Sequence, residues 1–171
     1  MNIEDGILTR RSVRKFQPNN RLSKKDTDEL LNMAMHAPSA HNSQPWEFIV
    51  VDDQNLFNKI MAIHPYSSFL KDASAAIIVC GNLKEQYNEN YWMGDCAAAT
   101  ENLLLGAHGK GLGSCWCGIY PVEERMKAFH HLLQMPEHIQ PFSMVVLGYA
   151  ADEPKQPKDR FKEHKIHNNM W

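Results

Sequence analysis

Residues 91–108 constrain the possible folds more than any other part of the chain. The apolar residues of this segment would surround most of a helix, and they are Ala97, Ala98, Ala99, Leu103, Leu104, Leu105 and Ala107. A helix that is apolar on every side is a buried one, so this helix is expected at the centre of the fold. Its consecutive alanines would also let another helix approach closely, which suits a subunit interface.

Helix and strand patterns alternate along the rest of the chain. Residues 75–80, AAIIVC, form a continuous apolar run that is typical of a strand buried on both faces. Ser23 and Asp26 resemble a capping box that begins a helix, and Pro38 ends that helix. The spacing of apolar residues predicts further helices over residues 2–14, 54–63 and 122–134, and further strands over residues 48–51 and 143–149.

Glycines separate the central helix from the next helix along the chain. Gly106, Gly109, Gly111 and Gly113 predict a loop, and the polar residues 151–171 predict an extended tail. The order of elements is helix, helix, strand, helix, strand, helix, helix and strand. In a chain of 171 residues this order predicts one α+β domain, 1–171, with a mixed sheet covered by helices.

Composition narrows the classes of function. The formal net charge is −2, whereas a dedicated nucleic-acid-binding domain is usually basic. No secretory signal or apolar run of membrane-spanning length is visible, so we expect a cytoplasmic protein with neither a nucleic-acid nor a membrane partner. The thiols are expected to be reduced, and the C-x-C spacing of Cys115 and Cys117 is not that of a metal site. We therefore predict no metal.

The stretch RRSVRKF at residues 10–16 concentrates positive charge in a chain that is otherwise close to neutral. A solvated basic helix end is one explanation, and a bound phosphate is the other. If the helix predicted over residues 2–14 runs through this stretch, Arg10 and Arg14 lie one turn apart on the same face, while Arg11 points elsewhere. Two guanidinium groups on one face suit a phosphate, because they bind it through charge-assisted hydrogen bonds.

Three motifs together resemble those of the FMN-dependent nitroreductase family, in one of its short versions. They are RRSVRKF at residues 10–16, APSAHNSQPWEFIVV at 37–51 and GLGSCWCGIYP at 111–121. The helix over residues 91–108 is similar to the family's central helix, so the resemblance covers essentially the whole chain. It implies a nitroreductase-like fold and an intertwined homodimer with FMN at the subunit interface.

The resemblance also implies which residues bind the cofactor. The phosphate, the ribityl chain and the pyrimidine edge would be held by Arg10, Arg11, Ser12 and Arg14. The flavin would be approached from one side of the interface by Pro38, Ser39, Ala40, Asn42 and Gln44. The backbone of Cys117 and Gly118 would face the flavin N5 atom, and Lys158 and Arg160 match a C-terminal basic pair that reaches the phosphate.

The implied activity is that of an NAD(P)H oxidoreductase with FMN as its cofactor. In a ping-pong cycle, NAD(P)H would reduce FMN and leave, and a nitroaromatic, quinone or similar electron-poor acceptor would take its place. The flavin carries the chemistry, so no side chain is predicted to be catalytic. Other flavin redox roles on the same fold, such as dehalogenation or ring oxidation, and a non-catalytic flavin-binding protein are the alternatives.

The chain departs from its longer relatives around the pocket. Those relatives carry an Asn and a Lys that contact flavin, where this chain has Tyr66 and Phe69, with Lys71 nearby. The chain also has little room for the extra helices that cover the site in longer relatives. We therefore expect a pocket that is open or is covered by residues 64–71 or 83–92.

Overall fold

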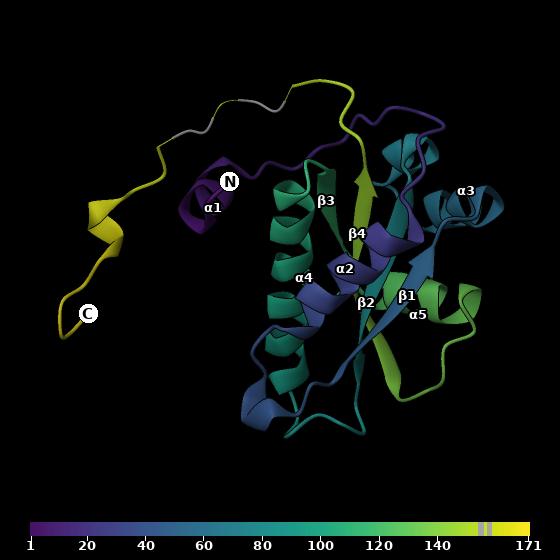
Figure 1. Cartoon of the computed structure of the whole chain (residues 1–171). Helices are drawn as coiled ribbons and strands as arrows, with labels where there is room; N and C mark the ends of the chain where they lie inside the picture. Colours follow the sequence, from purple (N-terminus) through teal and green to yellow (C-terminus); the bar gives the residue numbers. More distant parts are fainter. Residues whose placement is uncertain (154–155, 157–158) are drawn as a thin grey trace.

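The computed structural model of the chain describes residues 1–153, 156 and 159–171. Its centre is a four-stranded sheet with the order β1-β2-β4-β3 (Figure 1). The strands are β1 (Trp46–Val51), β2 (Ala75–Asn82), β3 (Gly113–Gly118) and β4 (Ile139–Gly148). All three pairs of neighbouring strands are antiparallel, so β2 and β4 lie inside the sheet and β1 and β3 lie at its edges.

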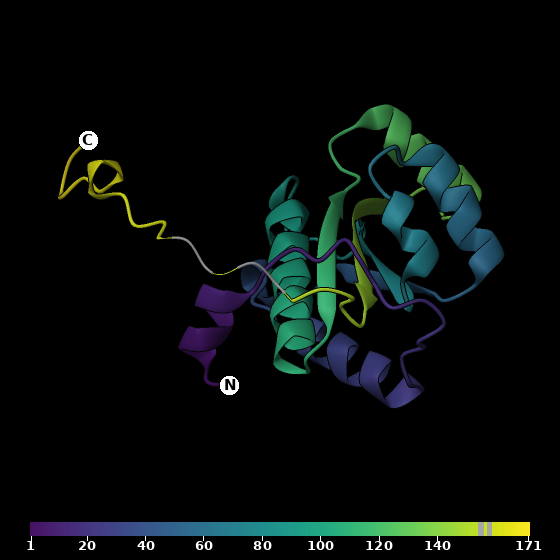
Figure 2. The same ribbon diagram turned by 90° about the horizontal axis from the view of Figure 1, so that it is seen from above.

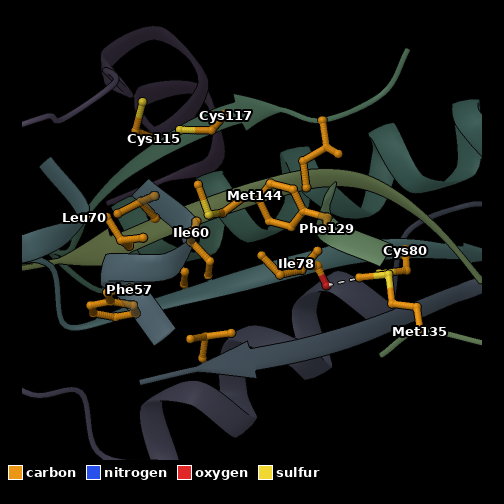
Figure 3. Close-up of a cluster of buried hydrophobic side chains, with 14 of the residues drawn as sticks. Phe57, Ile60, Leu70, Ile78, Cys80, Cys115, Cys117, Phe129, Met135 and Met144 are labelled. Atoms are coloured by element: carbon orange, nitrogen blue, oxygen red, sulfur yellow. Dashed lines mark hydrogen bonds between the residues drawn. The ribbon is translucent and has the colours of Figure 1, made fainter. Parts of the chain in front are cut away.

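Helices cover both faces of the sheet, as the view from above shows (Figure 2). The helices are α1 (Ile3–Thr9), α2 (Lys24–Met35), α3 (Gln54–Ile63), α4 (Tyr91–Gly109) and α5 (Glu123–Leu132). Helices α2 and α4 share one apolar cluster with Ile77 and Val79 of β2. Helices α3 and α5 share the other cluster with Ile78 and Cys80 (Figure 3). The alternation of side chains along β2 thus supplies both cores.

Two predictions about the core are confirmed. Every residue of β2 is buried, as the continuous apolar run indicated. Helix α4 packs against α2 and the sheet, with Cys96, Ala99, Leu103 and Leu104 among its buried residues. The apolar circumference of α4 is therefore matched by neighbours on several sides.

Local capping explains where two of the helices begin. The Ser23 hydroxyl accepts a hydrogen bond from the Asp26 N–H at 3.0 Å, so the predicted capping interaction is present at α2. The Asp53 carboxylate caps α3 in the same way, accepting from the Leu56 N–H at 2.8 Å. Because these bonds join residues three apart, the sequence alone was sufficient to place both helix starts.

Three predicted features of the fold are wrong. The segment predicted as a glycine-rich loop contains strand β3, whose backbone pairs with β4 from Gly113 to Gly118. The sheet is antiparallel rather than mixed, and a parallel pairing occurs instead as an isolated bridge between Ser12 and Ser114. The first helix ends at Thr9, not at residue 14. In each case, backbone pairing with a distant segment decided the outcome.

Gly81 offers a direct test of packing between β2 and α4. A Cβ atom at this position would lie 2.4 Å from Cε3 of the Trp92 ring, so Gly81→Ala forces the indole away from the strand. We expect Gly81→Ala to lower the free energy of unfolding by about 1–3 kcal/mol, the usual cost of overpacking a core. The measurement is urea denaturation of the purified protein.

Gly94→Ala on α4 is the matched control, because a Cβ atom there meets nothing within 4 Å. This substitution should leave stability unchanged or raise it, since alanine loses less conformational entropy in a helix than glycine. Equal unfolding midpoints for Gly81→Ala and the wild type would show that the Trp92 ring does not pack tightly against the strand.

Candidate functional site

The basic segment at residues 10–16 is extended and lies beside the start of β3. The Val13 N–H donates to the Ser114 carbonyl at 2.8 Å, and Ser12 forms the parallel bridge to Ser114. The predicted helical spacing of Arg10 and Arg14 is therefore wrong, because Arg10 has the non-helical backbone angles φ −54° and ψ 132°. What brings the two arginines near the same strand is backbone pairing, not a helix face.

The three arginines of this segment have different surroundings. Arg10 pairs with Glu101 of α4 across 3.4 Å. The Arg11 guanidinium donates to the carbonyls of Leu8 and Arg10, at 3.0 and 2.6 Å, and so satisfies the C-terminal end of α1. Arg14 is exposed and lines a hollow of about 600 Å³ together with Lys15, Lys71 and one carboxylate, Asp72, so that cations outnumber acidic groups there. This hollow is the cationic part of the candidate site.

The segment from Pro38 to Gln44 has an unusual backbone. His41, Asn42 and Gln44 have φ values of 50°, 56° and 49°, in the left-handed region that residues other than glycine rarely occupy. The Gln44 N–H donates to the Ser39 hydroxyl at 3.0 Å, and the Gln44 amide donates to the Asn42 side chain at 2.9 Å. Such a concentration of strained residues occurs most often where a ligand is bound.

Asp95 of α4 anchors this segment. Its Oδ1 atom accepts a hydrogen bond from the Ala40 N–H at 3.0 Å. Its Oδ2 atom is buried and has no hydrogen-bond partner among the described residues. Sequence reasoning missed Asp95, although an acidic residue next to the apolar run Cys96–Ala99 is a usable signal, because a carboxylate is seldom buried without a partner.

The C-terminal end of β3 carries Cys117 and Gly118. Both thiols of the C-x-C pair are buried members of the apolar cluster that α3 and α5 share (Figure 3). A hydrogen bond with Cys115, together with burial, raises the pKa of Cys117, and burial raises the pKa of Cys80 to about 12. The same hydrogen bond lowers the pKa of Cys115 to about 7. Cys80 and Cys117 are therefore packed as thiols, and at Cys117 the backbone is the part left to face a ligand.

The predicted site residues do not all meet within one chain. The N-terminal segment contacts α4 at Glu101 and at His108, where the Thr9 hydroxyl lies 2.7 Å from the ring Nε2. The segment around Ala40 contacts the other end of the same helix, at Asp95 (Figure 1). At 1.5 Å per residue, Asp95 and His108 lie about 20 Å apart along α4. Glu101, which pairs with Arg10, is about 9 Å from Asp95 along the helix, so the two segments contact different turns of α4.

The tail adds a third separate group. Residues 159–171 are all exposed and project away from the sheet and helices (Figures 1 and 2). Arg160 is exposed within this segment, and Lys158 lies outside the described residues. The exposed apolar residues of this tail are Phe161, Ile166, Met170 and Trp171.

Three residues near the predicted pocket take different positions. Tyr66 is exposed, and its ring centroid lies 6.0 Å from the Arg125 guanidinium carbon. Phe69 is half-buried against Phe16, with the ring centroids 6.2 Å apart. Lys71 is exposed in the same hollow as Arg14, so of the three it is the residue placed to contact an anionic ligand.

The charged and polar groups of the candidate site fit a flavin mononucleotide. The cationic hollow suits a phosphate, and the buried, unpaired Asp95 Oδ2 beside Ala40 suits an N–H donor such as a pyrimidine ring carries. No group of three or more His, Cys, Asp or Glu that could hold a metal ion occurs in the described part of the chain. Across the same residues, none of the helices combines the length and apolarity that a membrane span requires.

Fold and site together define an α+β protein in which polar and cationic segments gather along one long helix. The sequence model of the nitroreductase family matches residues 7–64 and 61–149. The chain belongs to this family, whose members are oxidoreductases. The family resemblance of the three motifs is thereby confirmed.

Similar proteins extend over almost the whole length of the chain. A protein of Archaeoglobus fulgidus with the provisional name NADH dehydrogenase/NAD(P)H nitroreductase is 46% identical over 168 residues, covering 96% of both chains. A structure from Parabacteroides distasonis with the same provisional name has a TM-score of 0.92 and 36% identity, covering 98% of both chains. An FMN-dependent nitroreductase from Clostridium difficile has a TM-score of 0.89 and 27% identity, covering 99% of this chain and 100% of its own.

Proposed function

We propose that the protein is an NAD(P)H oxidoreductase that uses FMN and reduces nitroaromatics, quinones or similar electron-poor acceptors. The observation that carries the proposal is the pairing of a cationic hollow at Arg14 with a strained polar segment at Pro38–Gln44, in a chain of this family. The FMN-dependent nitroreductase with the same fold supports the choice of cofactor. When bound, FMN supplies the hydride chemistry between NAD(P)H and the acceptor in a ping-pong cycle.

The chain's own residues bind and orient the cofactor. Arg10 and Arg14 hold the phosphate through charge-assisted hydrogen bonds, with Ser12 as a hydroxyl donor. Arg11 is already bonded to carbonyls at the end of α1, so its contribution is a nearby charge. Asn42 and Gln44 present amides to the pyrimidine edge, and the backbone of Cys117 and Gly118 directs an N–H toward N5.

The site is completed by a second copy of the chain. The Arg10–Arg14 segment contacts α4 at Glu101, and the Pro38–Gln44 segment contacts it nearer its N-terminus, at Asp95. An antiparallel pairing of two α4 helices would bring one copy's arginines to the other copy's Pro38–Gln44. An apolar groove of about 720 Å³ between α1, α2 and α4 offers a surface for this pairing, with Met1, Ile3 and Met33 in its lining. Arg160 in the exposed tail would then reach the phosphate of the shared site.

Two observations decide between this function and a flavin-binding role without catalysis. The test is anaerobic stopped-flow reduction of the FMN-loaded protein by NADH and by NADPH, followed by a panel of nitroaromatic and quinone acceptors. We expect loss of the flavin absorbance with at least one nicotinamide and its return with an acceptor. Tight FMN binding without reduction by either nicotinamide would contradict the proposal, as would a protein that takes up no FMN.

The alternative redox roles give a different result. If reduced flavin forms but no nitroaromatic or quinone reoxidises it, the same fold serves another reaction, such as dehalogenation or ring oxidation. The proposed class of electron acceptor would then be wrong, and the proposal that FMN is the cofactor would still be supported.

A further inference from the structure

His64 is a buried titratable residue that the proposed chemistry does not use. It follows α3, and its side chain is buried among core residues, with the Phe129 ring edge-on to it at a centroid distance of 6.3 Å. The Tyr66 N–H points to the His64 Nδ1 atom at 3.4 Å. Nδ1 is therefore the acceptor, and the proton of the neutral ring lies on Nε2. Burial lowers the pKa of His64, which favours this neutral form.

The Nε2–H of His64 is directed at the end of β3. It lies 3.1 Å from the carbonyl oxygen of Gly118, and the Arg125 guanidinium donates to the same oxygen. His64 approaches from the end of α3 and Arg125 from α5, so two separate elements fix one peptide group. Arg125 is also held by the Tyr66 ring, 6.0 Å from its guanidinium carbon.

Two hydrogen bonds to the carbonyl of a glycine have a large influence on the backbone conformation at that residue. Glycine has more backbone freedom than any other residue, so the direction of the N–H at Gly118 depends on contacts that hold the residue from outside. The strand itself supplies such contacts on one side only, because Gly118 is the last residue of an edge strand. The bonds from His64 and Arg125 supply them on the other.

We propose that His64 and Arg125 are positioning residues that fix the Gly118–Ile119 peptide and, by restricting the backbone angles of Gly118, aim the N–H of the preceding Cys117–Gly118 peptide at the flavin N5 atom. The proposal rests on the proposed function for the identity of the ligand. Its structural part, the clamp on Gly118, concerns the protein before any cofactor is bound. A preorganised donor of this kind stabilises charge during reaction because it does not have to reorient.

The clamp is tested in the protein without cofactor by hydrogen exchange. His64→Leu and Arg125→Met each remove one donor, and we expect amide exchange at Gly118 and Ile119 to become at least tenfold faster while exchange in β2 stays unchanged. His64→Gln keeps a side-chain N–H donor and should restore most of the protection. Lys127→Met is the control, because Lys127 is exposed on the same helix as Arg125 and pairs with Glu123.

The consequence for the cofactor is tested in the FMN-loaded protein. At saturating nicotinamide we expect flavin reduction to be about tenfold slower in His64→Leu and Arg125→Met, with the FMN dissociation constant within threefold of the wild-type value. Unchanged exchange at Gly118, or an unchanged reduction rate in either folded variant, would overturn the proposal. A parallel loss of stability and FMN binding would assign both residues a merely structural role and would overturn it too.

Failure of the proposed function has a different signature. A wild-type protein that binds no FMN, or is not reduced by NADH or NADPH, contradicts the oxidoreductase assignment directly. The exchange measurement on Gly118 still decides the clamp in that case. If His64→Leu does not fold, Arg125→Met keeps both measurements available, because Arg125 is only half-buried on α5.

Discussion

Replacing Arg10 with alanine is expected to raise the dissociation constant of FMN about a hundredfold. Hydrogen bonds to a charged group contribute about 1.5–3 kcal/mol each, and a phosphate bound by a guanidinium fork loses up to two of them. Folding should change little, since the pair formed by Arg10 and Glu101 is partly exposed and pairs of this kind contribute at most about 1 kcal/mol. Fluorescence titration of the apoprotein with FMN measures the effect.

Arg160→Ala tests the same phosphate from the other end of the chain. It should weaken FMN binding in the same direction without altering the unfolding midpoint, because Arg160 is exposed in the tail. Lys24→Ala provides the control, since Lys24 is 87% exposed and pairs with Asp28 one helical turn away. If both arginine variants bind FMN with wild-type affinity, then neither Arg10 nor Arg160 binds the phosphate.

Removal of the tail should prevent formation of the proposed dimer and, with it, the proposed binding of FMN. A chain ending at Glu153 loses residues whose apolar side chains are displayed to solvent, with Phe161 74% exposed and Met170 82% exposed. Such side chains are expected to be buried against another surface, and the second copy of the chain is the partner that the proposed site requires. Light scattering coupled to size-exclusion chromatography gives the mass, and flavin absorbance gives the cofactor content.

The truncation leaves the folded part of the chain intact. It keeps the hydrogen bond from Ala151 to the Lys15 carbonyl and the ion pair between Lys15 and Asp152, which hold the last described residues of the body to the basic segment. His164→Ala in the full chain is the control, because it changes a polar residue of the tail and preserves the apolar ones. A truncated protein of dimer mass with full FMN content would show that the tail has no part in assembly.

The features that sequence predicted well depend on neighbours along the chain. The boundaries of α3 match the prediction at residues 54–63, because an amphipathic stripe and the Asp53 cap are both local signals. The burial of β2 followed from its composition, since a strand without a polar side cannot face water. The family was identified from three short motifs. Their residues and their order along the chain can be read without knowing which segments contact one another in the fold.

The candidate site was predicted only as a set of residues, not as an arrangement. Arg10 and Arg14 were expected on one helix face, yet α1 ends at Thr9 and the arginines follow an extended segment bridged to β3. Helical spacing was the only geometry that sequence could supply there. A bridge between residues 12 and 114 has no signature in either segment alone.

Sequence by itself therefore determined the helices with caps and stripes, the buried strand and the membership of a family, because each depends on residues a few positions apart or on the identity of short motifs. The tertiary structure alone decided that the glycine-rich segment is strand β3, that Asp95 anchors Ala40, and that His64 and Arg125 converge on Gly118. These features depend on hydrogen bonds between segments distant in the chain. A backbone group donates or accepts such a bond whatever its own side chain, so the sequence around that group does not identify its distant partner.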